Sequence, residues 1–268
     1  MRVERILSLE HLLNAFYRRS YKLISLDQLE QLIKVADYYL ALPTVSSSIE
    51  SILLISDDML RQIPTFATRF LLAAKVIRSP TLFREAFVHT VGKWSEMSEN
   101  EKGDFEELAS TELTNLVLKC NNKLCGMLTS LFRFTLSIQT ADWNMTSTER
   151  IEREVVKGTI AMASIWPQSI SPGGDVTYCR DLHNASFKPD DDQVQEYRSA
   201  KPRSQRNSRQ TLSQRAKESV HRYTQPLLKN NLRLAAIAFG ADQPDYCYFL
   251  CTNLDAEDMP WDAAELDW

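Results

Sequence analysis

Apolar residues recur at three- and four-residue spacing through most of the first 140 residues of the chain. The most complete helix signal begins at Ser25, which can cap a helix and has Gln28 three residues later as its capping-box partner. The apolar stripe after this cap is Leu29, Leu32, Ile33, Ala36 and Leu40. This spacing matches the 3.6-residue period of one helix face, so it predicts an amphipathic helix that Pro43 ends near residue 42.

Further start and stop signals divide this part of the chain into successive helices. The first predicted helix covers residues 3–17, and one helix face collects Ile6, Leu9, Leu12, Leu13 and Phe16. Thr65 is the predicted cap of a later helix, which Ser79 and Pro80 end. The same pair opens the next helix, because serine suits the cap and proline the first helical position.

Two capping boxes predict the last helices of this series. The box from Ser98 to Glu101 opens an apolar pattern that reaches residue 134, and Gly126 or the asparagine pair at 121–122 is the expected break. The box at 146–149 opens one more helix. Successive helices with short connections predict antiparallel neighbours that bury shared apolar faces.

Glycine is scarce in this chain. Seven glycines occur in 268 residues, where average usage of about 7% would give roughly nineteen. Nucleotide-binding α/β folds need glycine at tight turns and where the backbone approaches phosphate, so the scarcity favours helices. The predicted fold class is mainly α: an antiparallel helical stack, a long irregular loop and a small C-terminal element, for which periodicity leaves a helix, a short strand and a hairpin open.

Composition divides the chain into four predicted segments. Residues 1–138 form the helical domain and residues 139–168 a further helix. Residues 169–210 are rich in Pro, Gly, Asp, Asn and Ser and lose apolar periodicity, which predicts an irregular, partly disordered linker. Residues 211–268 form a C-terminal helix and an acidic tail, with eight acids and no Lys or Arg from residue 240 onward.

The predicted linker ends in a basic run without acids. Its cations are Arg198, Lys201, Arg203, Arg206 and Arg209. Such a run occurs in nuclear-import signals and anion contacts, but it is more typical of a solvated linker. The formal net charge of −4 gives no sign of a dedicated nucleic-acid binder.

Known catalytic and metal-binding patterns do not occur in the sequence. The four histidines are scattered, without a His-Glu-x-x-His or Gly-x-Ser-x-Gly motif, and His89 among apolar neighbours is typical of a packed histidine. The five cysteines lack the ligand spacing of a zinc site and indicate free thiols in a reducing compartment. No enzyme activity, cofactor or metal is predicted.

The run LEQLIKVADYYLALPTVSSSIE, residues 29–50, resembles the final helices of a BTB/POZ domain. Together with FLLAAKVIRSPTLFREAFVHTVGKW, residues 70–94, and the closing YFLCTNLDAEDMPWD, it resembles a group of fungal BTB proteins with a helical, BACK-like extension. The resemblance implies an adaptor that binds other proteins. The strands that build the BTB sheet have no counterpart here, which puts in doubt the BTB dimer surface and the docking onto a cullin-type ubiquitin ligase that the resemblance implies. No site residues are carried over.

The predicted function is a protein–protein interaction module, an adaptor or scaffold, with Tyr38, Tyr39, Phe87 and Trp94 as candidate aromatic anchors. The alternatives are a nucleus-associated regulator that uses the basic run at 198–209, and an enzyme with an unrecognised site. The start of the chain lacks the apolar core of a secretory signal, and no apolar run approaches the roughly 20 residues that span a bilayer. We therefore expect a protein partner and a cytoplasmic or nuclear location, without membrane contact.

Overall fold

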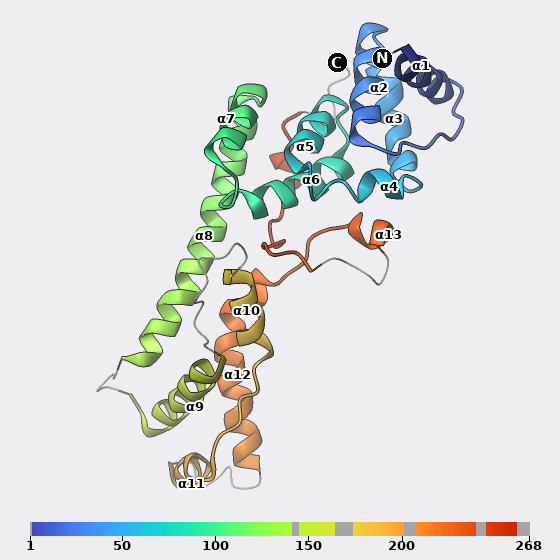
Figure 1. Cartoon of the computed structure of the whole chain (residues 1–268). Helices are drawn as coiled ribbons and strands as arrows, with labels where there is room; N and C mark the ends of the chain where they lie inside the picture. Colours follow the sequence, from blue (N-terminus) through green and yellow to red (C-terminus); the bar gives the residue numbers. More distant parts are fainter. Residues whose placement is uncertain (1, 141–144, 164–173, 201–206, 240–244, 262–268) are drawn as a thin grey trace. The chain divides into compact units, whose positions relative to one another are not determined.

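The computed structural model describes residues 2–140, 145–163, 174–200, 207–239 and 245–261. The chain is mainly α-helical, as predicted (Figure 1). Of the options left open for the C-terminal element, the structure has short helices at 235–239 and 256–258, and no strand occurs in the described ranges.

The chain divides into two compact units. Unit 1 comprises residues 1–121, 231–246 and 252–268, and unit 2 comprises residues 122–230 and 247–251. The boundary falls inside one long helix, so the predicted domain limit at 138 is not where the packing changes. The predicted C-terminal segment is likewise divided, because its helix belongs to unit 2 and most of the residues after that helix belong to unit 1.

Unit 1 is a stack of short helices (Figure 1). They are α1 (Arg2–Phe16), α2 (Leu26–Tyr38), α3 (Leu42–Leu53), α4 (Asp57–Leu60), α5 (Ala67–Val76), α6 (Pro80–Lys93), α7 (Glu99–Leu108), the start of α8 (Thr111–Gln139), α13 (Ala235–Phe239) and the 3-10 helix η2 (Ala256–Asp258). Helix α1 packs against α2 and α3, and α5 packs against α6. The stripe predicted after Ser25 is core, because Leu29, Leu32 and Ala36 have no exposed surface.

Three predicted caps of unit 1 are confirmed. The Ser25 hydroxyl accepts from the backbone N–H of Gln28 at 3.3 Å, and the Ser79 hydroxyl accepts from Leu82 at 3.3 Å, ahead of Pro80. Ser98 and Glu101 form the reciprocal capping box. Each cap satisfies a backbone donor that has no partner inside its helix, which fixes where the helix begins.

Two predicted helix limits were wrong. Helix α5 begins after Phe66 without a side-chain cap, so Thr65 is not its cap. Helix α2 ends at Tyr38, and Pro43 lies in the first turn of α3 and does not terminate α2. Proline fits the first turn because the backbone donor that it lacks has no partner there, and the sequence alone leaves both roles open.

The long helical pattern opened by Ser98 breaks earlier than predicted. Helix α7 ends at Leu108, and α8 begins at Thr111 and runs through both the asparagine pair and Gly126. The break lies at Ala109, whose extended backbone has a ψ of 154°. Ser110 then caps the new helix by accepting from the backbone N–H of Leu113.

Unit 2 packs helices around a second core. Its helices are the remainder of α8, α9 (Ser147–Ala163), α10 (Gly174–Asn184), α11 (Asp191–Ala200) and α12 (Ser208–Leu227). Helix α9 opens with the predicted box, in which Thr146 and Glu149 bond reciprocally. Buried apolar residues from all these helices form this core.

The prediction of an irregular linker at 169–210 was wrong for its described part. Helices α10 and α11 occupy much of it. Asp190 and Gln193 cap α11 reciprocally, and Val194 and Tyr197 are buried one turn apart. The polar composition hid this helix because only two residues of its ten carry the buried face.

Leu40 has a left-handed backbone conformation, with φ of 52°. It ends α2 in a Schellman-type turn, in which the Ala41 N–H donates to the carbonyl oxygen of Ala36 at 2.7 Å. Glycine usually occupies this position because a Cβ makes the left-handed conformation costly. The Leu40 side chain is 90% exposed, so packing does not offset that cost.

We therefore expect Leu40→Gly to raise the free energy of unfolding by about 0.5 to 1 kcal/mol. Leu54→Gly is the matched control, because Leu54 is also exposed but ends α3 with φ of −66°. There glycine only adds conformational freedom to the unfolded chain. The free energy of unfolding of Leu54→Gly should therefore fall by about as much as that of Leu40→Gly rises. Urea unfolding followed by circular dichroism measures both, and destabilisation of both variants would contradict the strain assigned to Leu40.

Candidate functional site

The outer face of α1 and the residue after it carry exposed apolar side chains. They are Ile6, Leu9, Leu13, Phe16 and Tyr17, all exposed. Ile6 is 64% exposed and Leu13 is 48% exposed, whereas Leu12, which lies beside this row, and Ala15 belong to the core. The apolar side chains of this helix therefore cover a wide arc, and only part of that arc packs within unit 1.

This arrangement corrects the prediction that α1 buries a single apolar face. Leu12 alone of the predicted stripe is buried, and the small residues Ser8 and Ala15 fill the rest of the inner side with His11. The His11 ring stacks on Tyr21 at a centroid distance of 5.1 Å. The outer residues 6, 9, 13 and 16 have the three-four-three spacing of a helix seam. Periodicity identified these residues but not the side that faces the core.

Tyr38 and Tyr39 are exposed at the end of α2, as anchors for a partner would have to be. Tyr38 is 80% exposed, and its ring contacts that of Tyr39 edge-to-face at 5.0 Å. Leu40 comes next, with its side chain in solvent. Three consecutive large apolar side chains thus project from one turn, a feature that aromatic-rich protein interfaces share.

Phe87 and Trp94, the other two candidate anchors, are buried and cannot contact a partner. Phe87 has no exposed surface and stacks on Phe83 at 6.0 Å, while Trp94 lies edge-to-face with Phe105 at 5.7 Å. Helix α6 is buried on almost every side, from Leu82 to Gly92. An apolar stripe cannot reveal this, since the polar residues Glu85, His89 and Thr90 are buried as well.

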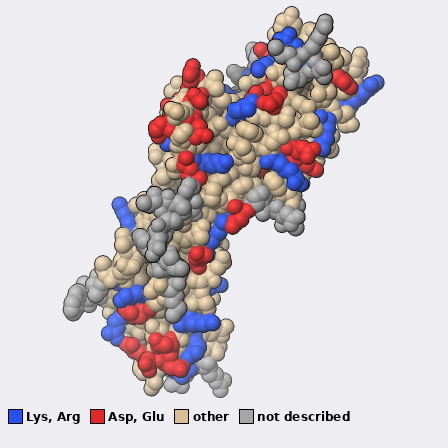
Figure 2. Space-filling model, viewed as in Figure 1, with Lys and Arg blue, Asp and Glu red and all other residues tan. Residues whose placement is uncertain are grey.

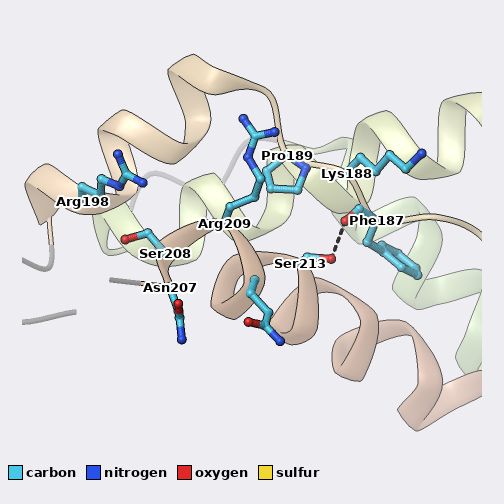
Figure 3. A pocket seen from close by; sticks show the side chains of 9 residues that line it. Phe187, Lys188, Pro189, Arg198, Asn207, Ser208, Arg209 and Ser213 are labelled. Atoms are coloured by element: carbon cyan, nitrogen blue, oxygen red, sulfur yellow. Dashed lines mark hydrogen bonds between the residues drawn. The ribbon is translucent and has the colours of Figure 1, made fainter. Parts of the chain in front are cut away.

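Part of the basic run surrounds a cavity in unit 2. Arg198, near the end of α11, and Arg209, at the start of α12, both line it, and Lys188 joins them from the segment between α10 and α11 (Figure 3). Lys201, Arg203 and Arg206 lie outside the described residues. The cavity has a volume of about 460 Å³, and none of its nine described lining residues is acidic. Lys188 lies ten residues before the run, and the charge pattern did not single it out.

The cavity walls are held by contacts between separate elements. The Ser213 hydroxyl on α12 donates to the carbonyl oxygen of Phe187, which is itself buried. Arg209 forms an ion pair with Asp191 at the start of α11. The side chain of Asp191 is 95% exposed, so this ion pair lies in solvent and contributes little to stability.

A buried polar group on α6 holds the C-terminal segment of unit 1. The Glu85 carboxylate, 3% exposed, accepts hydrogen bonds from the backbone N–H groups of Arg233, Leu234 and Ala235 at 2.7, 3.0 and 2.8 Å. Burial raises the pKa of Glu85, and the three N–H donors oppose this rise. These contacts place Glu85 at the start of α13, which identifies it as a structural anchor.

Two of the five cysteines, Cys179 and Cys251, are unreactive thiols by their surroundings. Burial raises the pKa of Cys179 to about 12 and that of Cys251 to about 11, so both remain protonated thiols at neutral pH. Throughout the described part of the chain, no three His, Cys, Asp or Glu residues are grouped as metal ligands. No helix in those same ranges has the length and apolar character to cross a membrane.

The candidate sites are therefore an apolar outer face on α1, an aromatic turn at the end of α2 and, in unit 2, a basic cavity. Comparison with known proteins adds no function to this geometry. No family model, curated protein or solved structure matches the chain.

Proposed function

We propose that the chain is a protein–protein interaction module that binds an amphipathic helix of a partner protein on the outer face of α1. The observation that carries this proposal is the exposed row Ile6, Leu9, Leu13 and Phe16 on a helix that packs within unit 1 through other residues. Apolar surface left in water is unfavourable by about 25 cal/mol per Å², so a partner helix gains by covering it.

The spacing of the exposed row supports a helical partner. Side chains at a three-four-three interval form a straight seam that knobs of a second helix can enter. Arg5 and Glu10 flank the seam as exposed charges, where charged side chains set the choice and orientation of a partner helix. The aromatic turn of Tyr38 and Tyr39 is a second candidate contact, since Tyr is enriched among the residues that dominate binding energy.

The resemblance to fungal BTB proteins with a BACK-like extension agrees with this proposal. If the chain is related to those proteins, it acts as an intracellular adaptor or scaffold, and its helical stack presents the binding surface. The proposal does not require the BTB sheet, because the exposed row lies on α1 itself.

The test is quantitative affinity purification of the full-length tagged protein and its Leu13→Glu variant from its native cells. A charge in the middle of the apolar row should abolish capture of the partner, because the unpaired carboxylate would be buried at the contact. Ser20→Glu is the matched control, since Ser20 is exposed, lies outside the row and gains the same charge. We expect that control to retain the partner.

Circular dichroism must show the same helix content and melting temperature in both variants, because Leu13 lies at the surface of unit 1. An unchanged set of captured proteins for folded Leu13→Glu would disprove binding through the outer face of α1. Loss of the partner from both variants would show an electrostatic effect and would equally contradict the apolar contact.

A further inference from the structure

We infer that the partner helix of the proposed function is α1 of a second copy of this chain, and that the two helices form a short parallel coiled coil. The inference rests on the proposed function, because it names the partner of the same exposed row, Ile6, Leu9, Leu13 and Phe16. Helix α1 lies at the edge of the helical stack of unit 1, beside α2 and α3 (Figure 1). The row is open to solvent, so a second molecule can reach it.

The spacing of the row fixes its coiled-coil register. In the seven-residue repeat abcdefg, the apolar positions a and d follow one another at intervals of three and then four residues. The intervals in α1 are three, four and three, which places Ile6 and Leu13 at a and Leu9 and Phe16 at d. A β-branched residue at a with leucine at d favours two parallel helices, and Ile6 with Leu9 has this composition.

Two charged residues beside the row select a second copy as the partner. In this register Arg5 is at position g and Glu10 at position e, and both side chains are exposed. In a parallel pair, a g residue faces the e residue five positions further along the other helix. Arg5 of one copy then lies beside Glu10 of the other, and two-fold symmetry repeats this pair. One helix carries both halves of the ion pair, so it complements a copy of itself.

The antiparallel order of the same two helices lacks this complementarity. There g positions face g positions and e positions face e positions, so arginine meets arginine and glutamate meets glutamate. The formal net charge of −4 gives only weak repulsion between copies, and basic and acidic side chains are interspersed on the face that Figure 2 shows. Because charges in solvent are screened beyond about 8 Å, the pairs beside the row decide the orientation.

The contact is short, so the dimer should be weak. Standard stable interfaces use about 20 to 30 residues from each partner. The row and its two flanking charges supply six residues from each copy. We therefore expect a dissociation constant of about 10 to 100 µM.

The test is sedimentation equilibrium of the full chain at low salt, over concentrations from about 5 to about 500 µM that bracket this dissociation constant. We expect a monomer–dimer equilibrium in the wild type. Glu10→Arg and Arg5→Glu should each weaken the dimer about tenfold, because each turns two attractive pairs into two repulsive ones. A chain with both changes forms both pairs again, so it should dimerise within about threefold of the wild type.

A mixture of the two single variants gives the most specific measurement. The Glu10→Arg chain has arginine at both positions and the Arg5→Glu chain has glutamate at both, so one copy of each forms two attractive pairs. We expect a heterodimer at concentrations where neither variant associates alone. Glu107→Arg is the control for Glu10→Arg, because Glu107 is exposed on α7, outside the row, and the change in charge is the same. Circular dichroism confirms that each variant is folded.

These measurements distinguish failure of the inference from failure of the proposed function. A wild-type chain that stays monomeric, while capture from native cells still depends on Leu13, overturns the inference but leaves the proposed function standing with a different protein as partner. If Leu13→Glu changes neither the dimer nor the captured proteins, both are wrong.

The variants also test the register itself. A dimer that Glu10→Arg and Arg5→Glu leave as strong as the wild type has no parallel pairing of these charges, which overturns the inference. Equal weakening by Glu10→Arg and Glu107→Arg overturns it as well, because that result would reflect the net charge of the chain. A mixture of the two single variants that remains monomeric would contradict the pairing of Arg5 with Glu10 directly.

Discussion

Replacing Glu85 with alanine should lower the free energy of unfolding of unit 1 by about 3 kcal/mol, because it leaves three backbone N–H groups without their acceptor. These groups belong to Arg233, Leu234 and Ala235, of which the last two are buried. A buried donor without a partner costs roughly 1 to 3 kcal/mol, and the start of α13 would detach from α6 before that full cost is reached.

Hydrogen exchange measured by mass spectrometry locates this effect. In Glu85→Ala the amides of residues 233–235 should exchange faster than in the wild type, whereas those of α9 in unit 2 should not change. Glu85→Gln keeps the shape but replaces one acceptor oxygen with a donor, so its loss of stability should lie between wild type and alanine. Glu107→Ala is the control, because Glu107 is exposed on α7 and its loss should cost less than about 0.5 kcal/mol.

Unchanged protection of residues 233–235 in folded Glu85→Ala would show that the carboxylate does not hold the segment. The contact joins positions 148 residues apart, and nothing in the pattern around Glu85 distinguishes it from an exposed glutamate on an amphipathic helix. Only the fold reveals it.

The features that could be predicted from the sequence are local ones. Ser25, Ser79 and Ser98 act within three residues of themselves, and their caps occur where predicted. The mainly α fold is explained by repeated caps and a 3.6-residue apolar period. Helix α11 was missed although Asp190 and Gln193 form a similar local cap, because the polar composition around them outweighed that signal.

The features that could not be predicted depend on contacts between distant segments. Whether Phe87 faces a partner or the core depends on what covers α6, and the covering residues include the C-terminal segment. The sequence identifies the apolar residues of the outer face of α1. It does not show that the small residues Ser8 and Ala15 are the ones that pack against the core. The cavity combines Lys188 with Arg198 and Arg209 through the folding of unit 2, so only the last two could be proposed from the basic run.

Acid should destabilise unit 1 through His89. This side chain is 1% exposed on α6 and lies edge-to-face with Tyr246 at 5.1 Å. Burial, with a smaller effect of the charge on Lys93, lowers the pKa of His89 from 6.5 to about 3. Below pH 6.5 the unfolded chain therefore binds a proton that the folded chain does not, and unfolding becomes more favourable as the pH falls toward 3.

The expected loss is about 1.4 kcal/mol per pH unit between roughly pH 6 and pH 4, or about 2 to 3 kcal/mol between pH 7 and pH 4.5. Glu85, one turn away, has a raised pKa and acts in the opposite direction, because the folded chain takes up its proton first. The two effects are separated by urea unfolding of the wild type and His89→Gln across this pH range. Glutamine does not titrate, whereas Glu85 contributes to both curves.

As the pH falls from 6.5 to 4.5, the free energy of unfolding should fall less for His89→Gln than for the wild type. This holds whatever stability the substitution itself loses at neutral pH. Parallel curves would show that His89 takes up its proton in the folded state, and the burial argument would then be wrong. A growing difference means that α6 is held in place by a histidine that must remain neutral. The C-terminal segment that contacts α6 through Glu85 and Tyr246 would then be released most readily in acid, because the unfolding that frees it is favoured there.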